Sequence, residues 1–207
     1  MESTKLEQAI ELIKKDKERK FNQSVDLIVN LRKIDLKKTQ INSFVTLPHK
    51  IKEKKVCGFI ESKSSVINTI PKSQFPIYKD KKKVKKLIKE YDFFIASAPN
   101  MPLVATTFGR VLGPAGKMPS PKLGILSDDS EKNVKELIER INKTVRVQTK
   151  EPSIKVSIGK LSMKENELVE NATQIYNSVL NELPNGKDNI KSVIVKSTMG
   201  KPFRVVM

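Results

Sequence analysis

The sequence has few of the side chains that metal binding and general acid–base catalysis use. Its 207 residues include one cysteine, one histidine and no tryptophan. Cys57 has no partner for a disulfide, and no neighbouring cysteine or histidine with which to hold a metal ion. His49 also stands alone, and we interpret it as a structural residue. No cofactor is therefore expected.

Long apolar segments are absent as well. No run approaches the ~18 apolar residues of a membrane-spanning helix. The sequence shows no signal peptide, and no amphipathic helix pairs a basic face with large aromatic side chains. These absences argue against a membrane partner and, together with the single cysteine, favour the reducing cytoplasm.

Positive charge is abundant instead. Lys and Arg number 40 against 23 Asp and Glu, which gives a net charge of +17. Such an excess predicts a polyanionic partner, and nucleic acid is favoured once a membrane is excluded. With 38% hydrophobic residues, the chain should fold rather than remain a disordered basic tail.

The first third of the chain predicts a helix followed by two strands. Apolar residues recur at helical spacing over residues 6–13, and Thr4 with Glu7 has the form of a capping box. Apolar and polar residues then alternate with a period of two over residues 21–31, and a second strand is expected at residues 44–47. The first of these strands should have one face exposed to solvent.

The middle third has short apolar runs separated by segments that can be helical, which is typical of a βαβ chain. The runs span residues 56–60, 75–78 and 92–97. Helices are expected at residues 84–91 and 134–141, each with a stripe of apolar side chains. The middle third therefore predicts a small parallel sheet between helices.

The last third returns to an antiparallel pattern. A long helix should begin near Ser162, whose pairing with Glu165 forms a second capping box, and end at Asn185 and Gly186. Four strands surround it, at residues 144–148, 154–158, 192–196 and 203–206.

The outer thirds share one pattern and the middle has another, so the sequence predicts an α+β protein of two domains. Residues 1–52 and 146–207 would form a discontinuous α+β domain, and residues 53–145 an inserted α/β domain. The two chain crossings, near residues 52 and 145, would make a hinge.

Two segments have some features of phosphate-binding sites. Residues 79–86 contain six lysines, and we interpret them as the solvated face of a helix rather than as a phosphate site. Residues 109–119 contain glycines and a lysine, but Val111 and Met118 occupy the positions where a nucleotide-binding loop needs Gly and Ser or Thr. Pro114 also removes an amide donor. We interpret this segment as a rigid, turn-rich loop.

A third segment, residues 196–202, has the chemistry of an RNA contact. Its sequence, Lys-Ser-Thr-Met-Gly-Lys-Pro, places hydroxyls, two cations and a flexible apolar side chain within one turn. Glycine lets a ribose–phosphate backbone approach closely, hydroxyls can bond the 2′-OH, and methionine can pack on a ribose or base.

Four separated blocks resemble the ribosomal protein L-one family, especially its archaeal branch. Their order and spacing agree with the family, and the resemblance covers essentially the whole chain. The last two are specific enough to identify the family nearly alone. The blocks are Lys-Phe-Asn-Gln-Ser-Val-Asp at 20–26, Leu-Pro-His at 47–49, Leu-Gly-Pro-Ala-Gly-Lys-Met-Pro-Ser-Pro at 112–121 and the turn at 196–202.

The resemblance implies a fold and a role. In the family, an α+β domain made from both chain ends carries an inserted three-layer, Rossmann-like α/β domain. The first domain binds large-subunit rRNA, and the protein heads a mobile stalk that assists release of deacylated tRNA from the exit site. Many members also repress translation of their own mRNA. The resemblance therefore implies a non-catalytic RNA-binding protein of the ribosome that is a monomer when free.

The expected site residues follow from the matching blocks and from the chemistry of the terminal turn. Contacts with rRNA, or with the protein's own mRNA, are expected at Lys20, Phe21, Ser192, Lys196, Thr198, Met199, Gly200 and Lys201. Secondary RNA contacts in the inserted domain would involve Gly113, Gly116 and Lys117.

Two other classes of function stay open on the residues alone. A small α/β nucleotide-dependent enzyme using residues 113–117 would lack a plausible catalytic group. A general nucleic-acid architectural protein would explain the charge, but not the turn-specific blocks or the inserted domain. Selective binding to one rRNA fragment over duplex DNA would separate these hypotheses.

Overall fold

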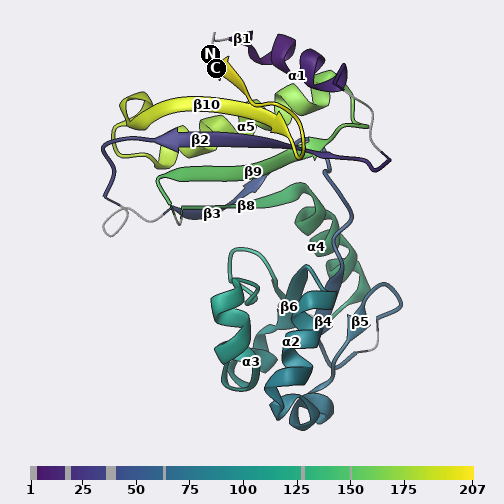
Figure 1. The fold of residues 1–207 in the computed structure, drawn as a ribbon. Coiled ribbons are helices and arrows are strands. Elements are labelled where there is room, and N and C mark those ends of the chain that lie inside the picture. The colour runs from purple at the N-terminus through teal and green to yellow at the C-terminus, as the bar shows by residue number, and fades with distance from the viewer. Residues whose placement is uncertain (1–3, 17–19, 36–40, 63, 127–128, 150) are drawn as a thin grey trace. The chain divides into compact units, whose positions relative to one another are not determined.

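The computed structural model describes residues 4–16, 20–35, 41–62, 64–126, 129–149 and 151–207 (Figure 1). The chain divides into two compact units: unit 1 comprises Met1–Lys52 and Lys143–Met207, and unit 2 comprises Glu53–Asn142. The second crossing lies at residue 143, slightly before the expected 146, because the strand that begins at Thr144 pairs within unit 1.

Among the described residues, unit 1 contains a five-stranded sheet and a separate two-stranded sheet. Its strands are β1 (Thr4–Lys5), β2 (Ser24–Leu31), β3 (Asn42–Thr46), β8 (Thr144–Gln148), β9 (Ser153–Lys160), β10 (Ile190–Ser197) and β11 (Phe203–Val206). Its helices are α1 (Leu6–Lys14), α5 (Glu165–Glu182) and the 3₁₀ helix η3 (Gly186–Asn189). The large sheet has the order β1-β11-β10-β2-β9, and β3 pairs with β8. Only the short β1 runs parallel to its neighbour in the large sheet.

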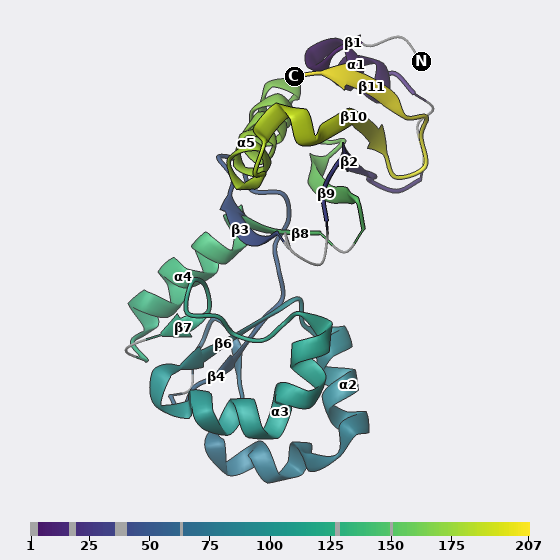
Figure 2. The same ribbon diagram turned by 90° about the vertical axis from the view of Figure 1, so that its left-hand side faces the viewer.

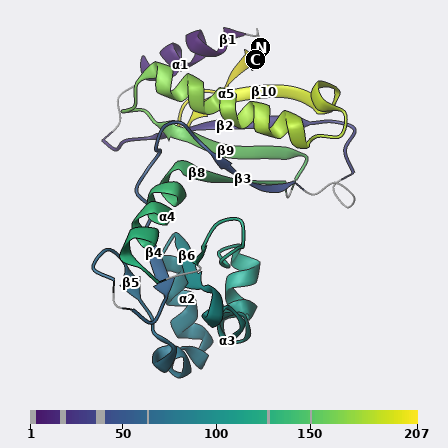
Figure 3. The same ribbon diagram turned by 180° about the vertical axis from the view of Figure 1, so that it is seen from behind.

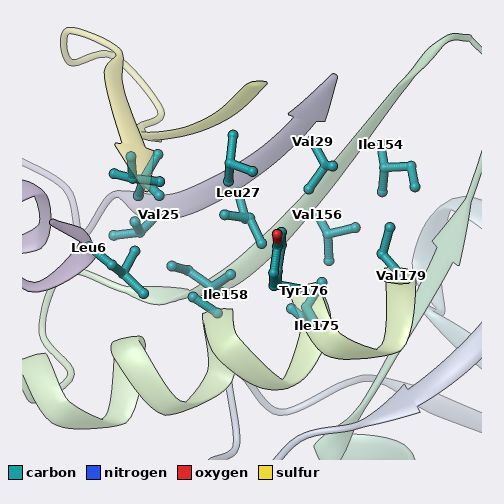
Figure 4. Packing of buried hydrophobic residues seen from close by; sticks show 14 of the residues in the cluster. Leu6, Val25, Leu27, Val29, Ile154, Val156, Ile158, Ile175, Tyr176 and Val179 are labelled. Carbon is teal, nitrogen blue, oxygen red and sulfur yellow. The ribbon is translucent and has the colours of Figure 1, made fainter. Parts of the chain in front are cut away.

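The period-two pattern of the strands places one face of the large sheet in the core. In β2, every second residue from Val25 to Leu31 is buried and the residues between are half-buried. The apolar stripe of α5 packs beneath these strands, and Figure 4 shows Ile175, Tyr176 and Val179 facing the strand side chains. Burial of this kind contributes roughly 1.5–3 kcal/mol per large apolar side chain.

Helices of unit 1 lie on one side of the large sheet. In Figure 1, α5 lies behind β10, β2 and β9, and in the opposite view of Figure 3 it lies in front of them. Across an antiparallel pair, directly opposed residues share a face. The other side, which we call the open face, therefore carries Asp26, Asn30, Lys155, Ser192 and Lys196.

Within its described part, unit 2 contains a parallel sheet with the order β5-β4-β6-β7. Its strands are β4 (Val56–Phe59), β5 (Asn68–Thr69), β6 (Phe93–Ser97) and β7 (Ile125–Leu126). Its helices are α2 (Lys81–Glu90), α3 (Met101–Ala115), α4 (Glu131–Lys143) and the 3₁₀ helices η1 (Lys72–Lys79) and η2 (Ala98–Asn100). Figure 2 shows α2 and α3 on one side of the sheet and α4 on the other.

Aromatic packing fixes α3 on that sheet. The ring of Phe59 in β4 lies 5.6 Å from that of Phe94 in β6 and 4.7 Å from that of Phe108 in α3, measured between centroids. All three side chains are fully buried. Stacked and tilted ring pairs at these separations stabilise a core beyond the effect of buried area alone.

The prediction of a turn-rich loop at residues 109–119 is wrong over residues 109–115, which are helical. The helix α3 continues through Gly109, Gly113 and Pro114. Burial of its apolar stripe offsets the poor helix propensity of glycine and proline. The stripe consists of Val104, Phe108 and Leu112, all fully buried.

Both predicted capping boxes are also wrong. Thr4 belongs to β1, and its hydroxyl donates to the carbonyl oxygen of Arg204 at 3.3 Å. The long helix is capped at Lys164 rather than Ser162, since the backbone N–H of Lys164 donates to the carboxylate of Glu167 at 3.2 Å. Thr4 is held in a strand by pairing with β11, a contact between the two ends of the chain that the local sequence could not reveal.

The apolar run at residues 75–78 is a 3₁₀ segment, not a strand. Pro76 lies inside η1, and proline cannot donate to a β-ladder. Phe75 still enters the core, where its ring meets that of Phe108 edge-on at 5.3 Å. The strand of this region is the short β5, which precedes the run.

A candidate nucleic-acid interface

The turn between β10 and β11 is joined to the segment that precedes β2. The carbonyl oxygen of Ser24 accepts hydrogen bonds from the backbone N–H and the hydroxyl of Thr198, at 3.0 and 3.1 Å. The N–H of Met199 donates to the side-chain oxygen of Gln23 at 3.1 Å. The antiparallel pairing of β10 with β2 brings these two blocks together. We call their combined surface the turn interface, defined as residues 20–24 and 196–201.

Large apolar side chains of the turn interface are exposed to solvent. Phe21 is 56% exposed and Met199 is 59% exposed. Lys20 and Lys201 are exposed beside them in sequence. An aromatic ring and a thioether can pack on bases or riboses, while ammonium groups meet phosphates. These side chains together have the chemistry of an RNA contact, which a hairpin turn without a binding partner would not need.

Gly200 lies close to neighbouring side chains of unit 1, and its backbone is not in the left-handed region. A Cβ at this position would overlap the hydroxyl oxygen of Ser197 and lie 3.0 Å from a carboxylate oxygen of Asp16. The N–H of Gly200 donates to the carbonyl oxygen of Ser197 at 3.1 Å. Packing within the protein thus accounts for the glycine.

Ser192 lies on the open face rather than in the turn. Its hydroxyl oxygen accepts a hydrogen bond at 3.0 Å from the side-chain amide of Asn30. Lys196 lies further along the same strand and opposite Asp26. With a rise of about 3.3 Å per residue, Ser192 and Lys196 are roughly 13 Å apart along β10. The candidate residues thus run from the turn interface onto the open face.

Asp26 is the acidic group among these cations and hydroxyls. Burial raises the pKa of its carboxyl group, while the Lys196 ammonium and a hydrogen bond with Ser157 lower it in part. The net direction is upward, because removal from water disfavours the charged form more than these partners favour it.

Sequence reasoning missed the residues that β9 and β11 add to the open face. Ser157 of β9 lies opposite Asp26. Lys155 of β9 and Arg204 of β11 are exposed and lie on the same face. The period-two alternation in the sequence indicated which residues of these strands face solvent. It did not indicate the order of the strands in the sheet.

Two of the three residues expected to make secondary RNA contacts, Lys117 and Gly116, have structural roles within unit 2. The ammonium group of Lys117 donates to the carbonyl oxygens of Ile88 and Tyr91, both at 2.7 Å, at the carboxyl end of α2. Gly116 ends α3 with a left-handed φ of 68°, a conformation that favours glycine. A Cβ at Gly113 would meet no atom within 4 Å.

Among the described residues, the one cysteine and the one histidine are poorly placed for catalysis. Burial raises the pKa of the Cys57 thiol to about 12, so it stays protonated and is a poor nucleophile at neutral pH. The imidazole of His49 lies 2.7 Å from the Glu170 carboxylate, and its backbone N–H donates to Asn171 at 3.1 Å. His49 thus ties the chain to α5.

The described residues contain no group of three or more His, Cys, Asp or Glu placed to hold a metal ion. None of their helices combines the length and the apolar character that crossing a membrane requires.

Comparison with known proteins points in one direction. The model of a family described as "Ribosomal protein L1p/L10e family" matches residues 13–201. "Large ribosomal subunit protein uL1" of Thermococcus kodakarensis is 36% identical over 201 residues, which cover 91% of this chain and 90% of that protein. The protein of the same name from Archaeoglobus fulgidus is 37% identical, with coverages of 95% and 94%. That of Methanobrevibacter smithii is 36% identical, with coverages of 97% and 99%.

Proposed function

The chain belongs to the ribosomal protein L1p/L10e family, and on this premise we propose that it binds large-subunit rRNA through the turn interface and the open face. Its relatives bear the name of a ribosomal protein of the large subunit, which confirms that the chain is not an enzyme and associates it with the ribosome. The two rival classes, a nucleotide-dependent enzyme and a general architectural protein, lose their support.

The observation that carries the proposal is the exposure of Phe21 and Met199 on a surface held together by hydrogen bonds. The bonds from Thr198 and Met199 to the segment before β2 fix that surface before any partner binds. A preorganised site has less conformational entropy to lose on binding. Sequence-specific RNA recognition stacks unpaired bases on such side chains, and hydroxyl-rich strands can read the 2′-OH.

The finer roles form part of the same proposal. We place the protein in the cytoplasm, at the head of the mobile stalk near the exit site, where it would assist release of deacylated tRNA. It would be a monomer when free, with unit 1 as the rRNA-binding domain and unit 2 as an inserted three-layer, Rossmann-like domain. A messenger that folds like the rRNA site would occupy the same surface. The rRNA fragment and the protein's own mRNA should then exclude one another.

The test is a pair of matched double variants. Phe21→Ala/Met199→Ala removes two exposed apolar side chains from the turn interface, and Ile77→Ala/Leu103→Ala removes two from unit 2, where they are 54% and 38% exposed. Affinity is measured for a large-subunit rRNA fragment that spans the stalk and for a scrambled duplex. Loss of stacking should cost roughly 1–3 kcal/mol per base in the first variant alone. Unchanged affinity there, with a loss in the second, would move the site to unit 2.

A further inference from the structure

The exposed side of α2 carries a line of lysines. Lys82, Lys85, Lys86 and Lys89 are all exposed and follow the spacing i, i+3, i+4, i+7, which places them on one side of the helix. The apolar stripe, at Val84 and Leu87, lies about half a turn away and is buried. At about 1.5 Å per residue, the line is roughly 10 Å long.

This line of charge is not neutralised within the described part of the protein. Those four lysines make no salt bridge and no side-chain hydrogen bond with any described residue. The sequence of α2 is Lys-Lys-Lys-Val-Lys-Lys-Leu-Ile-Lys-Glu, so Glu90 is the helix's sole acidic residue. Its first turn has no acidic residue at all.

Such a composition opposes the stability of α2 itself. The amino end of a helix carries partial positive charge, so lysines in the first turn are unfavourable. The protein compensates at both ends with other groups. The Asp80 carboxylate caps the amino end by accepting from the N–H of Lys82 at 2.9 Å, and Lys117 satisfies two carbonyls at the carboxyl end. The helix is thus stabilised without neutralising its exposed side.

The helix α4 of the same unit shows what a solvated helix surface looks like here. Its sequence, Glu-Lys-Asn-Val-Lys-Glu-Leu-Ile-Glu-Arg-Ile-Asn-Lys, intersperses charges of both signs. Glu131 bonds Ser65, and this contact lowers the pKa of the Glu131 carboxyl group. Mixed charges of this kind give solubility without a strong field. The exposed side of α2 differs from it in sign and uniformity.

We propose that α2 is a second RNA-binding surface, which holds the phosphate backbone of duplex RNA through Lys82, Lys85, Lys86 and Lys89. The surface is distinct from the turn interface and does not depend on it. A duplex presents regularly spaced phosphates, and about 10 Å of its axis carries several of them. The exposed side of α2 has no aromatic residue on which an unpaired base could stack, so it suits a duplex backbone better than a single strand. Binding there is independent of sequence.

The test removes two lysines from α2 or two from α4 in the full-length protein. Lys85→Gln/Lys89→Gln and Lys132→Gln/Lys135→Gln change the net charge equally, and all four side chains are exposed. Affinity for a duplex RNA of arbitrary sequence is measured across a salt series. The α2 variant should flatten the slope of log affinity against log salt by about 1–2, and lower the affinity at 0.1 M salt at least tenfold. The α4 variant should change neither quantity by a comparable amount.

The outcomes separate this surface from the proposed rRNA site. Loss of duplex affinity with unchanged discrimination between the rRNA fragment and a scrambled sequence supports the surface on α2. Equal effects of the α2 and α4 variants would show that duplex affinity depends on the net charge of the protein alone, and would overturn the proposed surface on α2. Competition by polyglutamate as strong as by duplex RNA, at equal charge concentration, would overturn it in favour of an acidic protein partner. The proposed rRNA site fails by a different result, namely intact discrimination in Phe21→Ala/Met199→Ala.

Discussion

The hydroxyl and the backbone N–H of Thr198 both donate to the carbonyl oxygen of Ser24, a residue 174 positions earlier in the chain. This shared acceptor fixes the turn between β10 and β11 against the start of β2. The side chains expected to meet RNA from the two blocks therefore keep one arrangement. The relationship gives Thr198 a role within the protein in addition to any contact with RNA.

Thr198→Val should loosen the turn interface while keeping the shape of the side chain. Loss of the hydroxyl removes one exposed hydrogen bond, so we expect the free energy of unfolding to fall by about 0.5–1 kcal/mol. Affinity for the rRNA fragment should fall further than stability does. Urea unfolding and fragment titration measure the two effects. Thr106→Val, which removes a hydroxyl bonded to Leu103 in α3, serves as the control and should leave affinity unchanged.

Gly200→Ala should destabilise unit 1 through its own packing. The new methyl group would overlap the Ser197 hydroxyl, and such overpacking costs about 1–3 kcal/mol. Adding Ser197→Ala removes the overlapping atom, and the double variant should recover most of the loss. A double-mutant cycle by urea unfolding measures the coupling. Additive effects would show that the glycine is needed for another reason.

Lys117→Met should destabilise unit 2 and leave discrimination between RNAs intact. The variant removes a charged donor from two carbonyls at the end of α2, and hydrogen bonds to charged groups contribute about 1.5–3 kcal/mol. Urea unfolding measures the stability. If Lys117 instead contacts RNA, fragment affinity will fall while the unfolding midpoint stays constant, and the role assigned here will be wrong.

How much the sequence could predict depended on whether the deciding contact was local. Alternation in residues 21–31 predicted β2 because a strand with one buried face must show that period. The helical run through Gly109 and Gly113 was missed, because burial of Phe108 against other elements outweighs local propensity. Thr4 was misplaced for the same reason, since its partner is β11 at the other end of the chain.

The candidate site was predicted best where its chemistry lies in one contiguous segment. The turn at residues 196–201 carries hydroxyls, cations and an exposed methionine, and these are visible in sequence. Lys155 and Arg204 could not be assigned to the open face, because strand order is a property of the folded sheet. The sequence analysis interpreted the lysines of α2 as a solvated helix face. It did not compare their uniform positive charge with the mixed charges of α4.

Asp26→Asn should stabilise the protein at neutral pH. Burial raises the pKa of Asp26 in the folded state above its ordinary value of 3.8, so the folded state binds this proton more tightly than the unfolded state does. Its contribution to stability is present below pH 3.8 and is lost as the pH rises through the folded-state pKa. The asparagine avoids this loss. Thermal unfolding between pH 3.5 and 7 should show a gain that grows with pH, and a loss at neutral pH would contradict the raised pKa.

Unit 1 should fold and bind the rRNA fragment without unit 2. The backbone N–H of Lys54 donates to the side-chain oxygen of Asn142 at 2.9 Å, so the two chain crossings lie close together and a short Gly/Ser linker can join residue 52 to residue 143. Circular dichroism and fragment titration of this shortened chain measure the result. Discrimination against scrambled RNA should persist, while duplex affinity falls with the loss of α2. A shortened chain that stays unfolded, while residues 53–142 fold alone, would show that the domain boundaries are wrong.

The strand order of unit 1 has a consequence for synthesis. The strand β2 is made early but lies between β9 and β10, and β10 spans Ile190–Ser197. Residues 53–142 are contiguous and are made next, whereas β2 meets its first neighbour, β9, only after them and its second neighbour, β10, later still. A nascent chain therefore lacks the turn interface. Unfinished copies should be unable to capture rRNA, so that assembly draws on completed molecules alone.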